Sequence, residues 1–412
     1  MAGKGKSPTL HINELSDAME AEGKEVFRFG FGESPFPVPE EIEEALRDNA
    51  HHKSYLPVQG LPQLREAVGR FHGGREELSI SRKQVMIGPG SKELMFLLQL
   101  CLKAEVIVPT PCWVSYVPHG EILGREVRLI HTTAEENWLL SAERLAIEVS
   151  DETPRLLIIN YPGNPQGTTY SSENLEALAE VVREKNIIVM SDEIYSELHH
   201  NGAHQSLARF YPEGTIISSG LSKWCGAGGW RLGTFIFPKK LSWLQETMCS
   251  VASETYSTVS APIQYAAVSA YSGGEAVESY LSASRRILKA LGNWAADRLN
   301  DIGLAVQRPE GAFYLFLDFS PFSYLLKARG VKTSDALCEK LLEETGVVLL
   351  SGKAFSRPLE ELTARLAYVT FNGGEALTAV GDSVGDGFLD AYCPKVIEGV
   401  EKLTKWLNEL SE

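Results

Sequence analysis

The sequence predicts an α/β protein of two domains, a large one built on a mostly parallel sheet flanked by helices and a smaller α+β one. Three observations lead to this prediction: the length of 412 residues, an alternation of short apolar runs with amphipathic helices, and a different pattern in the last third of the chain. A chain of this length exceeds the usual size of one hydrophobic core, so two domains are expected.

The first part of the pattern consists of short runs that are apolar at both even and odd positions, as in strands covered on both faces. These runs are 85–88, 105–108, 156–159, 187–190, 215–218 and 234–237. Amphipathic segments separate them, and in 173–185, for example, Leu175 and Leu178 share one helical face. Ser171 or Ser172 can cap that helix. Strands that alternate with helices form a mostly parallel sheet.

The last third of the chain predicts a small mixed sheet flanked by helices. Its candidate strands are 304–306, 312–317, 347–350 and 365–369. A long helix of about 279–301 is expected to join this part to the first. We therefore expect a large domain at 50–290 and a small domain that combines 1–49 with 291–412.

Charge and cysteine content narrow the functional classes. A formal net charge of −15 argues against a surface for nucleic acid or anionic membranes, because both would repel the molecule. The six cysteines stand singly without a Cys-x-x-Cys pair, as expected of reduced thiols in the cytoplasm. The basic first residues lack the apolar run of a secretory signal, and no run of about 18 apolar residues predicts a membrane span.

Polar residues follow five of the predicted strands, where ligands of open α/β sheets bind. Strand 85–88 continues into Pro89-Gly90-Ser91-Lys92 and a helix, so its small residues can expose backbone N–H groups to a phosphate. The same residues also form ordinary turns and caps. The loop 160–167 is rich in proline and glycine and would hold the amide of Asn164 rigidly.

Three charged residues follow the next strands. Asp192 stands at the tip of a buried strand, where a carboxylate needs a cationic partner. Lys223 follows strand 215–218, and a lysine in such a crevice can have a lowered pKa and act as a nucleophile toward carbonyls. Arg231 comes eight residues later. Taken singly, these residues could equally be a helix cap, a solvated charge and half of a salt bridge.

Their order along one chain is more specific than any one of them. It resembles that of the class I/II aminotransferases, the aspartate-aminotransferase-like group of fold-type I pyridoxal-phosphate enzymes. The resemblance covers about 29–368, and its most specific motifs are 164–167, 191–195, and Ser222-Lys223 followed by 229–233. It implies the fold-type I architecture and pyridoxal 5'-phosphate as the cofactor.

The resemblance assigns a set of residues to the cofactor. They are Tyr55, Gly90, Ser91, Lys92, Trp113, Asn164, Asp192, Tyr195, Ser222, Lys223 and Arg231. Lys223 would bind the cofactor as a Schiff base, and Asp192 would keep its pyridine nitrogen protonated so that the ring accepts electrons. Asn164 and Tyr195 would hydrogen-bond its phenolic oxygen. Lys223, Asp192 and Tyr195 are thus the expected catalytic residues.

The phosphate and the ring have their own expected partners. Arg231 would pair with the phosphate bidentately, together with Ser222 and the backbone amides of Ser91 and Lys92. The resemblance places the ring of Trp113 on the pyridine. Tyr55 resembles the tyrosine that reaches a neighbouring subunit's phosphate, which implies a homodimer.

Substrate residues follow from the same resemblance. They are Gly32, Trp113, Asn164 and Arg365. Arg365 matches the arginine that binds the α-carboxylate, for which a planar guanidinium is suited. Gly32 matches a segment that closes over the substrate. Without the resemblance, Arg365 would be interpreted as a surface residue.

The expected reaction moves an amino group from an L-amino acid to a 2-oxo acid by a ping-pong mechanism, with Lys223 as acid and base at the Cα proton. The alternative is a lyase with the same site, resembling C–S lyases or aminocyclopropane-carboxylate synthases, which would release product without an added keto acid. A cofactor-sensing regulator is a remoter alternative. Phe31, Phe36, Trp113 and Phe313 could line an apolar pocket for a neutral donor, or could belong to the core. No metal site is assigned.

Three features depart from the resemblance. Gly220 stands where many relatives have a phosphate-binding serine, and Gly163 replaces a commoner asparagine. The connection 370–394 is longer than the usual short turn. We expect this connection to be a tolerated surface insertion, with an ordered lid as the alternative.

Overall fold

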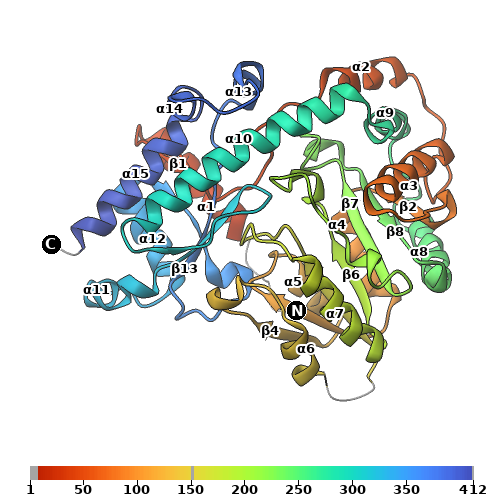
Figure 1. Ribbon diagram of the computed structural model, residues 1–412, viewed down its shortest axis with the longest axis horizontal. Coiled ribbons are helices and arrows are strands. Elements are labelled where there is room, and N and C mark those ends of the chain that lie inside the picture. The colour runs from red at the N-terminus through yellow and green to blue at the C-terminus, as the bar shows by residue number, and fades with distance from the viewer. Residues whose placement is uncertain (1–7, 150–152, 411–412) are drawn as a thin grey trace.

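The computed structural model describes residues 8–149 and 153–410, so the basic first residues lie outside the described part. A large sheet with its helices forms one part of the molecule, and smaller sheets with the last helices form the other (Figure 1). Helix α10 (Glu275–Asn300) runs across both and includes the predicted long helix. The prediction of an α/β fold with a large, mostly parallel sheet is confirmed.

The large sheet has seven strands in the order β2-β8-β7-β6-β5-β3-β4. Their bounds are β2 Val85–Gly88, β3 Glu105–Thr110, β4 Val127–His131, β5 Arg155–Asn160, β6 Ile188–Asp192, β7 Thr215–Gly220 and β8 Gly233–Ile236. All neighbours are parallel except β8, which is antiparallel to both β2 and β7. The six predicted runs are strands. Strand β4 was not predicted, because as an edge strand it is only partly buried and carries Arg128 and His131.

Helices cover the faces of this sheet (Figure 1). They are α2 Glu40–Asn49, α3 Pro62–Glu76, α4 Ser91–Cys101, α5 Tyr116–Ile122, α6 Ala142–Glu148, α7 Ser172–Glu184, α8 Ser242–Glu254 and α9 Ala261–Ser272. Helix α7 illustrates why they form: the Ser171 side chain accepts from the Asn174 N–H at its start, and Leu175 and Leu178 are buried. The predicted cap and apolar face are thus confirmed.

The second part contains two small sheets where one mixed sheet was predicted, so that detail was wrong. One sheet is antiparallel in the order β12-β13-β10-β9, and the other pairs β1 with β11 in parallel. The bounds are β1 Phe27–Arg28, β9 Ala305–Val306, β10 Tyr314–Asp318, β11 Val347–Val348, β12 Leu350–Ser351 and β13 Thr363–Ala367. The predicted run 347–350 divides between both sheets, because its first half bonds to the distant N-terminal strand β1.

The remaining helices pack around these small sheets. They are α1 Pro8–Ala21, α11 Ser323–Ala328, α12 Ser334–Thr345, α13 Gly373–Ala379, α14 Phe388–Tyr392 and α15 Pro394–Glu409. The connection 370–394 thus contains two short helices. Its middle is exposed, as expected of an insertion, but Phe371 packs edge-to-face on Phe36 and Cys393 is buried. Its ends are therefore part of the packed structure.

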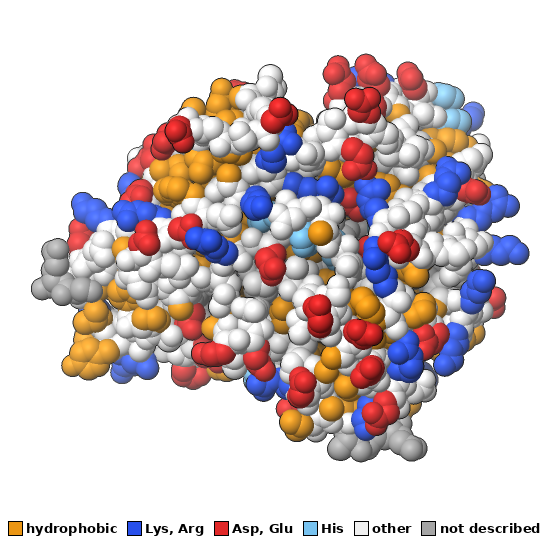
Figure 2. Space-filling view, viewed as in Figure 1, with side chains coloured by type: hydrophobic (Ala, Val, Ile, Leu, Met, Phe, Trp, Pro, Cys, Tyr) orange, Lys and Arg blue, Asp and Glu red, His pale blue; other side chains and the backbone are white. Residues whose placement is uncertain are grey.

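The largest hydrophobic cluster includes Ile217 of the large sheet, Leu288 of α10 and Leu366 of the small sheet. Apolar packing is therefore continuous between the two parts, while the domain limits 50–290 and 291–412 stay a prediction. On the face in Figure 2, acidic and basic side chains are interspersed over the surface. Within the described residues, no helix is long and apolar enough to cross a membrane.

Candidate active site

The carboxyl ends of three neighbouring strands meet at one place in the large sheet. In register, Asn160 at the end of β5 lies beside Asp192 at the end of β6, which lies beside Ser218 near the end of β7. The Asn160 side-chain amide donates to the Asp192 carbonyl oxygen at 2.8 Å. Its own Oδ1 accepts from the Asn164 N–H at 2.8 Å. Asn160 therefore ties the loop that carries Asn164 to the strand that carries Asp192.

Asp192 is buried, and one of its two oxygens has a partner. The Tyr116 hydroxyl donates to Oδ2 at 2.5 Å, whereas buried Oδ1 has no hydrogen-bond partner. Burial raises the pKa of Asp192 to about 7, although the Tyr116 hydroxyl acts in the opposite direction. Tyr116 also contacts Trp113 edge-to-face, with ring centroids 5.3 Å apart. A cation near Oδ1 would satisfy this oxygen and favour the carboxylate.

Lys223 points across the site toward the N-terminal segment. Its Nζ donates to the carbonyl oxygen of Gly32 at 2.7 Å and lies 5.8 Å from the ring centroids of both Tyr195 and Phe313. Desolvation, followed by the positive charge of Arg365, lowers the pKa of Lys223 to about 8. The amine can therefore lose its proton near neutral pH, which a reactive lysine requires.

Arg365 lies in β13 of the small sheet and is buried beside the large one. Its Nη1 donates to Asn164 Oδ1 at 3.0 Å and its Nη2 to the Gly30 carbonyl oxygen at 2.7 Å. The buried Nε has no partner. The guanidinium also lies 4.8 Å from the ring centroid of Tyr314. This buried cation, with one nitrogen that lacks a partner, is suited to a carboxylate.

Tyr195 and Tyr314 form a pair of buried hydroxyls next to these groups. Their oxygens lie 2.8 Å apart, and their rings meet edge-to-face. Gly32 packs directly against this pair, since a Cβ built at Gly32 would lie 2.2 Å from the Tyr314 hydroxyl oxygen. Only glycine therefore lets the N-terminal segment approach so closely.

The phosphate end of the predicted site is built by close backbone contacts. A Cβ on Gly90 would lie 2.2 Å from Arg231 Nη2, so the guanidinium lies against the start of α4. Arg231 itself adopts a left-handed backbone conformation, with φ 53°. A Cβ on Gly233 would lie 2.2 Å from the Ser91 N. Free N–H groups at a helix start, with an arginine beside them, form a cradle for an anion.

The structure explains why Gly163 and Gly220 stand where the resemblance predicts larger residues. A Cβ at Gly220 would lie 2.7 Å from the Leu232 carbonyl oxygen, so a serine could enter only if the backbone shifted. At Gly163, a Cβ would lie 2.1 Å from the Gln166 amide nitrogen. This chain thus packs its own backbone or side chains at the two positions where the resemblance predicts a larger residue.

Of the other predicted residues, Lys92 lies near the anion cradle, and Tyr55 lies apart from it. The Lys92 Nζ lies 4.9 Å from the ring centroid of Trp113. Partial desolvation, then the charge of Arg231, lowers the pKa of Lys92, and no carboxylate is among the groups that shift it. Ser222 is half-buried next to Lys223. Tyr55 is 91% exposed and makes no hydrogen bond or ring contact with the cluster among the described residues.

Sequence reasoning missed three residues of the cluster. Asn160 could have been found, because it is a polar residue that ends an apolar run. Tyr116 and Tyr314 gave no signal, since each reaches its partner through tertiary packing and not through a motif. Of the aromatic residues considered for a pocket, Phe36 and Phe313 are buried and Phe36 packs on Phe371, as in a core.

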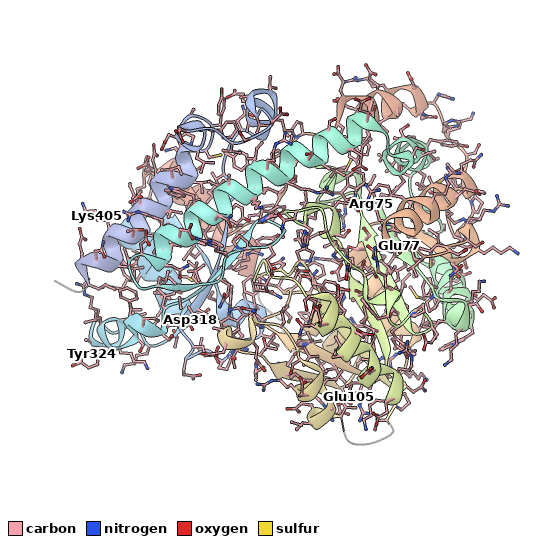
Figure 3. All side chains as sticks on the ribbon, in the orientation of Figure 1. Arg75, Glu77, Glu105, Asp318, Tyr324 and Lys405 are labelled. Carbon is pink, nitrogen blue, oxygen red and sulfur yellow. The ribbon has the colours of Figure 1, made fainter. Side chains whose placement is uncertain are left out.

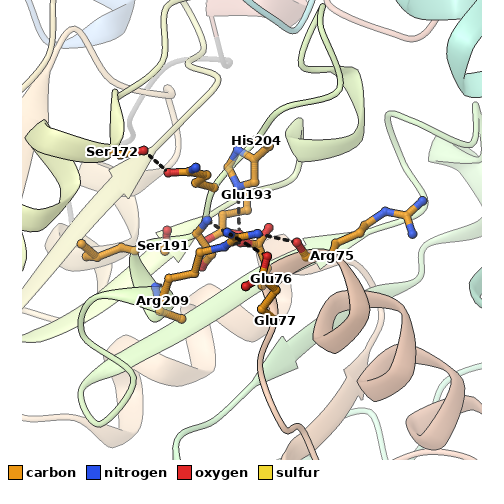
Figure 4. A network of polar contacts seen from close by, with 12 residues as sticks. Arg75, Glu76, Glu77, Ser172, Ser191, Glu193, His204 and Arg209 are labelled. Carbon is orange, nitrogen blue, oxygen red and sulfur yellow. Dashed lines mark hydrogen bonds and ion pairs between the residues drawn. The ribbon is translucent and has the colours of Figure 1, made fainter.

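A second charged cluster surrounds Glu193, the residue that follows Asp192 (Figure 4). Glu193 accepts from the Ser206 hydroxyl at 2.6 Å and lies 3.1 Å from His204 Nε2. Glu76, at the end of α3, accepts from the Ser206 N–H and from Arg209 Nε. Within the described residues, Glu76, Glu193 and His204 also form a group close enough to hold a metal ion, but Arg209 and Ser206 already satisfy its carboxylates.

The next carboxylate on this side is Glu197, which is also buried. Arg75 Nε donates to its Oε2 at 2.9 Å and Arg285 Nη2 at 3.2 Å. Figure 3 shows Arg75 and Glu77 at the end of α3, on the side of the large sheet. Arginines from α3 and α10 therefore hold Glu197, two residues after Tyr195.

The fold and this set of groups are suited to an enzyme that binds anionic ligands, with a lysine of lowered pKa beside a buried arginine. The sequence model of the family described as aminotransferase class I and II matches residues 24–370. An aspartate aminotransferase of Bacillus sp. (strain YM-2) is 34% identical over 375 residues, 88% of this chain and 92% of the relative. An asparagine–oxo-acid transaminase of Streptococcus mutans is 29% identical over 89% of this chain and 92% of the relative.

Solved structures agree with these matches. The aspartate aminotransferase of Thermus thermophilus with maleate superimposes with a TM-score of 0.83 and 28% identity, over 98% of this chain and all of that one. The chain belongs to the class I and II aminotransferase family. It is a pyridoxal-phosphate-dependent enzyme that transfers an amino group from an L-amino acid to a 2-oxo acid. The comparisons contain nothing that favours the lyase alternative.

Proposed function

We propose that this aminotransferase uses a four-carbon donor of the aspartate or asparagine type, with Arg365 binding the α-carboxylate and Lys92 the distal group. The observation that carries the proposal is the presence of two cations without a carboxylate partner near Trp113 and Asn164. Relatives named for aspartate and asparagine support it, as does a neighbour solved with maleate, a dicarboxylate.

The residues present fit the cofactor. The unpaired Oδ1 of Asp192 would face the protonated ring nitrogen, and a cation there would restore the charge that burial disfavours. Arg231, with the start of α4, would hold the phosphate. When bound, pyridoxal phosphate supplies an aldehyde that bonds to amines and a ring that accepts electrons. Tyr195 and Asn164 lie beside Lys223 and Arg365 and would bind its phenolic oxygen.

Lys223 is suited to proton transfer at the Cα atom of the donor. Its pKa of about 8 lets the amine accept a proton near neutral pH and return it in the next step. The Gly32 carbonyl oxygen, 2.7 Å from Nζ, would hold the amine in place between these steps. The lowered pKa of Lys223 follows from burial and from the charge of Arg365. A substrate carboxylate bound to Arg365 would therefore also change the pKa of Lys223.

Arg365 would orient the donor. Its Nη atoms are held by Asn164 and by the Gly30 carbonyl oxygen, while Nε is free to bind a carboxylate oxygen. Because the guanidinium is fixed before the substrate arrives, little conformational entropy is lost on binding. This orientation would keep the Cα proton within reach of Lys223.

Lys92→Met tests the donor class. We expect kcat/KM for aspartate to fall by about 10- to 100-fold, as for the loss of one charged hydrogen bond, while kcat/KM for alanine stays the same. Lys103→Met, an exposed lysine after the same helix, is the matched control and should change neither value. Equal losses for aspartate and alanine would contradict the proposed role of Lys92.

We also propose that the enzyme is a homodimer in which Tyr55 acts on the neighbouring subunit. The high exposure of Tyr55 within one chain supports this arrangement. Mixing inactive Lys223→Ala with weakly active Tyr55→Ala subunits should restore activity, because a mixed dimer has one site with both native residues. No recovery in a preparation shown to contain mixed dimers would argue against it. The six free cysteines support a cytoplasmic location.

A further inference from the structure

Tyr314 is a buried side chain in the middle of the site for which the preceding roles give no function. It belongs to β10 and is 1% exposed. Its hydroxyl oxygen lies 2.8 Å from that of Tyr195, and among the described residues the Tyr314 side chain makes no other hydrogen bond. The two rings meet edge-to-face with centroids 5.6 Å apart. The hydroxyl contact is therefore the one polar link of Tyr314.

The chemistry of hydroxyls fixes what this link can do. A tyrosine hydroxyl donates one hydrogen and can accept another at the same time. If Tyr195 donates its hydrogen to the cofactor, its oxygen can accept only from a donor within reach, and Tyr314 is that donor. A hydroxyl that accepts one hydrogen bond becomes a stronger donor in the next, because the chain of bonds is polarised.

The electrostatics favour donation from Tyr314. Burial raises the pKa of both tyrosines. The guanidinium of Arg365, 4.8 Å from the Tyr314 ring centroid, opposes that rise for both, but the pKa of Tyr195 is raised further, with the charge of Asp192 among the causes. The more acidic hydroxyl of a pair is the better donor, so the hydrogen between the two oxygens belongs to Tyr314 when Tyr195 donates elsewhere.

The ring of Tyr314 has a separate role in packing. A Cβ at Gly32 would lie 2.6–2.7 Å from two of its ring carbons, so the ring supports the segment whose carbonyl accepts from Lys223. A substitution that removes the ring would disturb this segment as well. Phenylalanine keeps the ring and removes the hydroxyl alone.

We propose that Tyr314 is a positioning residue of the amino-transfer site, whose hydroxyl donates to Tyr195 and strengthens Tyr195 as a donor to the phenolic oxygen of the cofactor. The inference rests on the proposed role of Tyr195. It adds a second tyrosine to the groups that set the charge of that oxygen. Tyr314 acts through Tyr195 and not by contact with the substrate.

The test is a pH titration of the visible absorption of the holoenzyme without substrate. A stabilised phenolic anion lowers the pH at which the cofactor changes its absorption, so Tyr314→Phe should raise the midpoint by about 0.5–1 pH unit, as for one neutral hydrogen bond. In a Tyr195→Phe background, Tyr314→Phe should have no further effect, because the two residues act in series.

Tyr368→Phe is the matched control. Tyr368 is fully buried just after β13, and its hydroxyl has no hydrogen-bond partner, so its removal should leave the midpoint unchanged. A Tyr314→Phe midpoint equal to or below that of the wild type would overturn the inference. An unaltered shift in the Tyr195→Phe background would overturn it too. A wild-type protein that gave no visible absorption with pyridoxal phosphate would overturn both the inference and the proposed site.

Discussion

The two sides of the segment that carries Asp192 and Glu193 differ in how their buried charges are paired. Behind the segment, Glu193 has both a hydroxyl and an imidazole partner, Glu76 has Arg209, and Glu197 has two arginines. In front, Asp192 keeps an oxygen without a partner. Neighbouring residues in the sequence therefore lie in opposite electrostatic environments.

The unpaired atoms are few. Among the described residues, the carboxylate and guanidinium groups with a buried atom that lacks a partner are Asp192, Arg286 and Arg365. Two of these three belong to the site. A buried polar atom without a partner costs about 1–3 kcal/mol, so such atoms persist where a ligand completes them. Paired charges hold the frame, and two of the three unpaired ones lie where we propose that the ligands bind.

The largest expected effect concerns Arg365. Arg365→Lys keeps a positive charge but removes the planar set of donors. We expect kcat/KM to fall by about 1000-fold, the equivalent of about 4 kcal/mol, while the urea midpoint of unfolding changes little. Steady-state kinetics and urea denaturation measure the two quantities. A fall in kcat/KM of less than tenfold would show that activity does not depend on this guanidinium.

The next effect concerns the buried ion pair of Glu76 and Arg209, whose loss should change stability and not activity. Arg209→Met leaves the buried Glu76 without its cation, so the free energy of unfolding should fall by about 3 kcal/mol while kcat/KM stays near the wild-type value. Arg183→Met is the matched control, because Arg183 and Glu213 form an exposed ion pair worth at most about 1 kcal/mol. If both variants lost the same stability, the distinction between buried and exposed pairs would not hold.

The smallest effect is a pH dependence of stability. Burial acts to lower the pKa of His204, but the hydrogen bond and charge of Glu193 outweigh it and raise the pKa above the usual 6.5. Because the pKa is raised, protonated His204 stabilises the folded state fully below pH 6.5. This stabilisation is lost as pH rises through the higher pKa of the folded state.

Asp192 also makes stability fall as pH rises, because burial raises its pKa to about 7. The contribution of His204 must therefore be measured by comparison with a His204 variant. The free energy of unfolding of the apoprotein should decline from pH 6 to 9 by more in the wild type than in His204→Gln. Equal slopes would mean that His204 carries no extra proton in the folded state.

The residues expected to contact the ligands could be predicted from the sequence better than the buried ion pairs that support them. The strand ends that carry Asn164, Asp192 and Lys223 follow apolar runs, so their positions could be inferred from the strand pattern alone. Glu76 and Arg209 are far apart in the chain, and composition gives no sign that a glutamate is buried. Their pairing depends on how α3 packs against the loop after β6.

The same limit applies to the tyrosines that contact Asp192 and Tyr195 and to the small sheets. Tyr116 and Tyr314 reach Asp192 and Tyr195 from 76 and 119 residues away in the sequence. Strand β11 pairs with β1 from the other end of the chain, which no local pattern indicates. Local motifs thus predicted which residues are present, and tertiary packing determined what each one contacts.

The most direct test of the account is to identify the lysine that binds the cofactor. The holoenzyme is reduced with borohydride, which makes the bond between amine and cofactor permanent, then digested and analysed by mass spectrometry. We expect the peptide containing Lys223 to gain the mass of one reduced cofactor, and Lys223→Ala to yield no such peptide. Modification of Lys92 or another lysine in the active wild-type enzyme, with Lys223 unmodified, would contradict it.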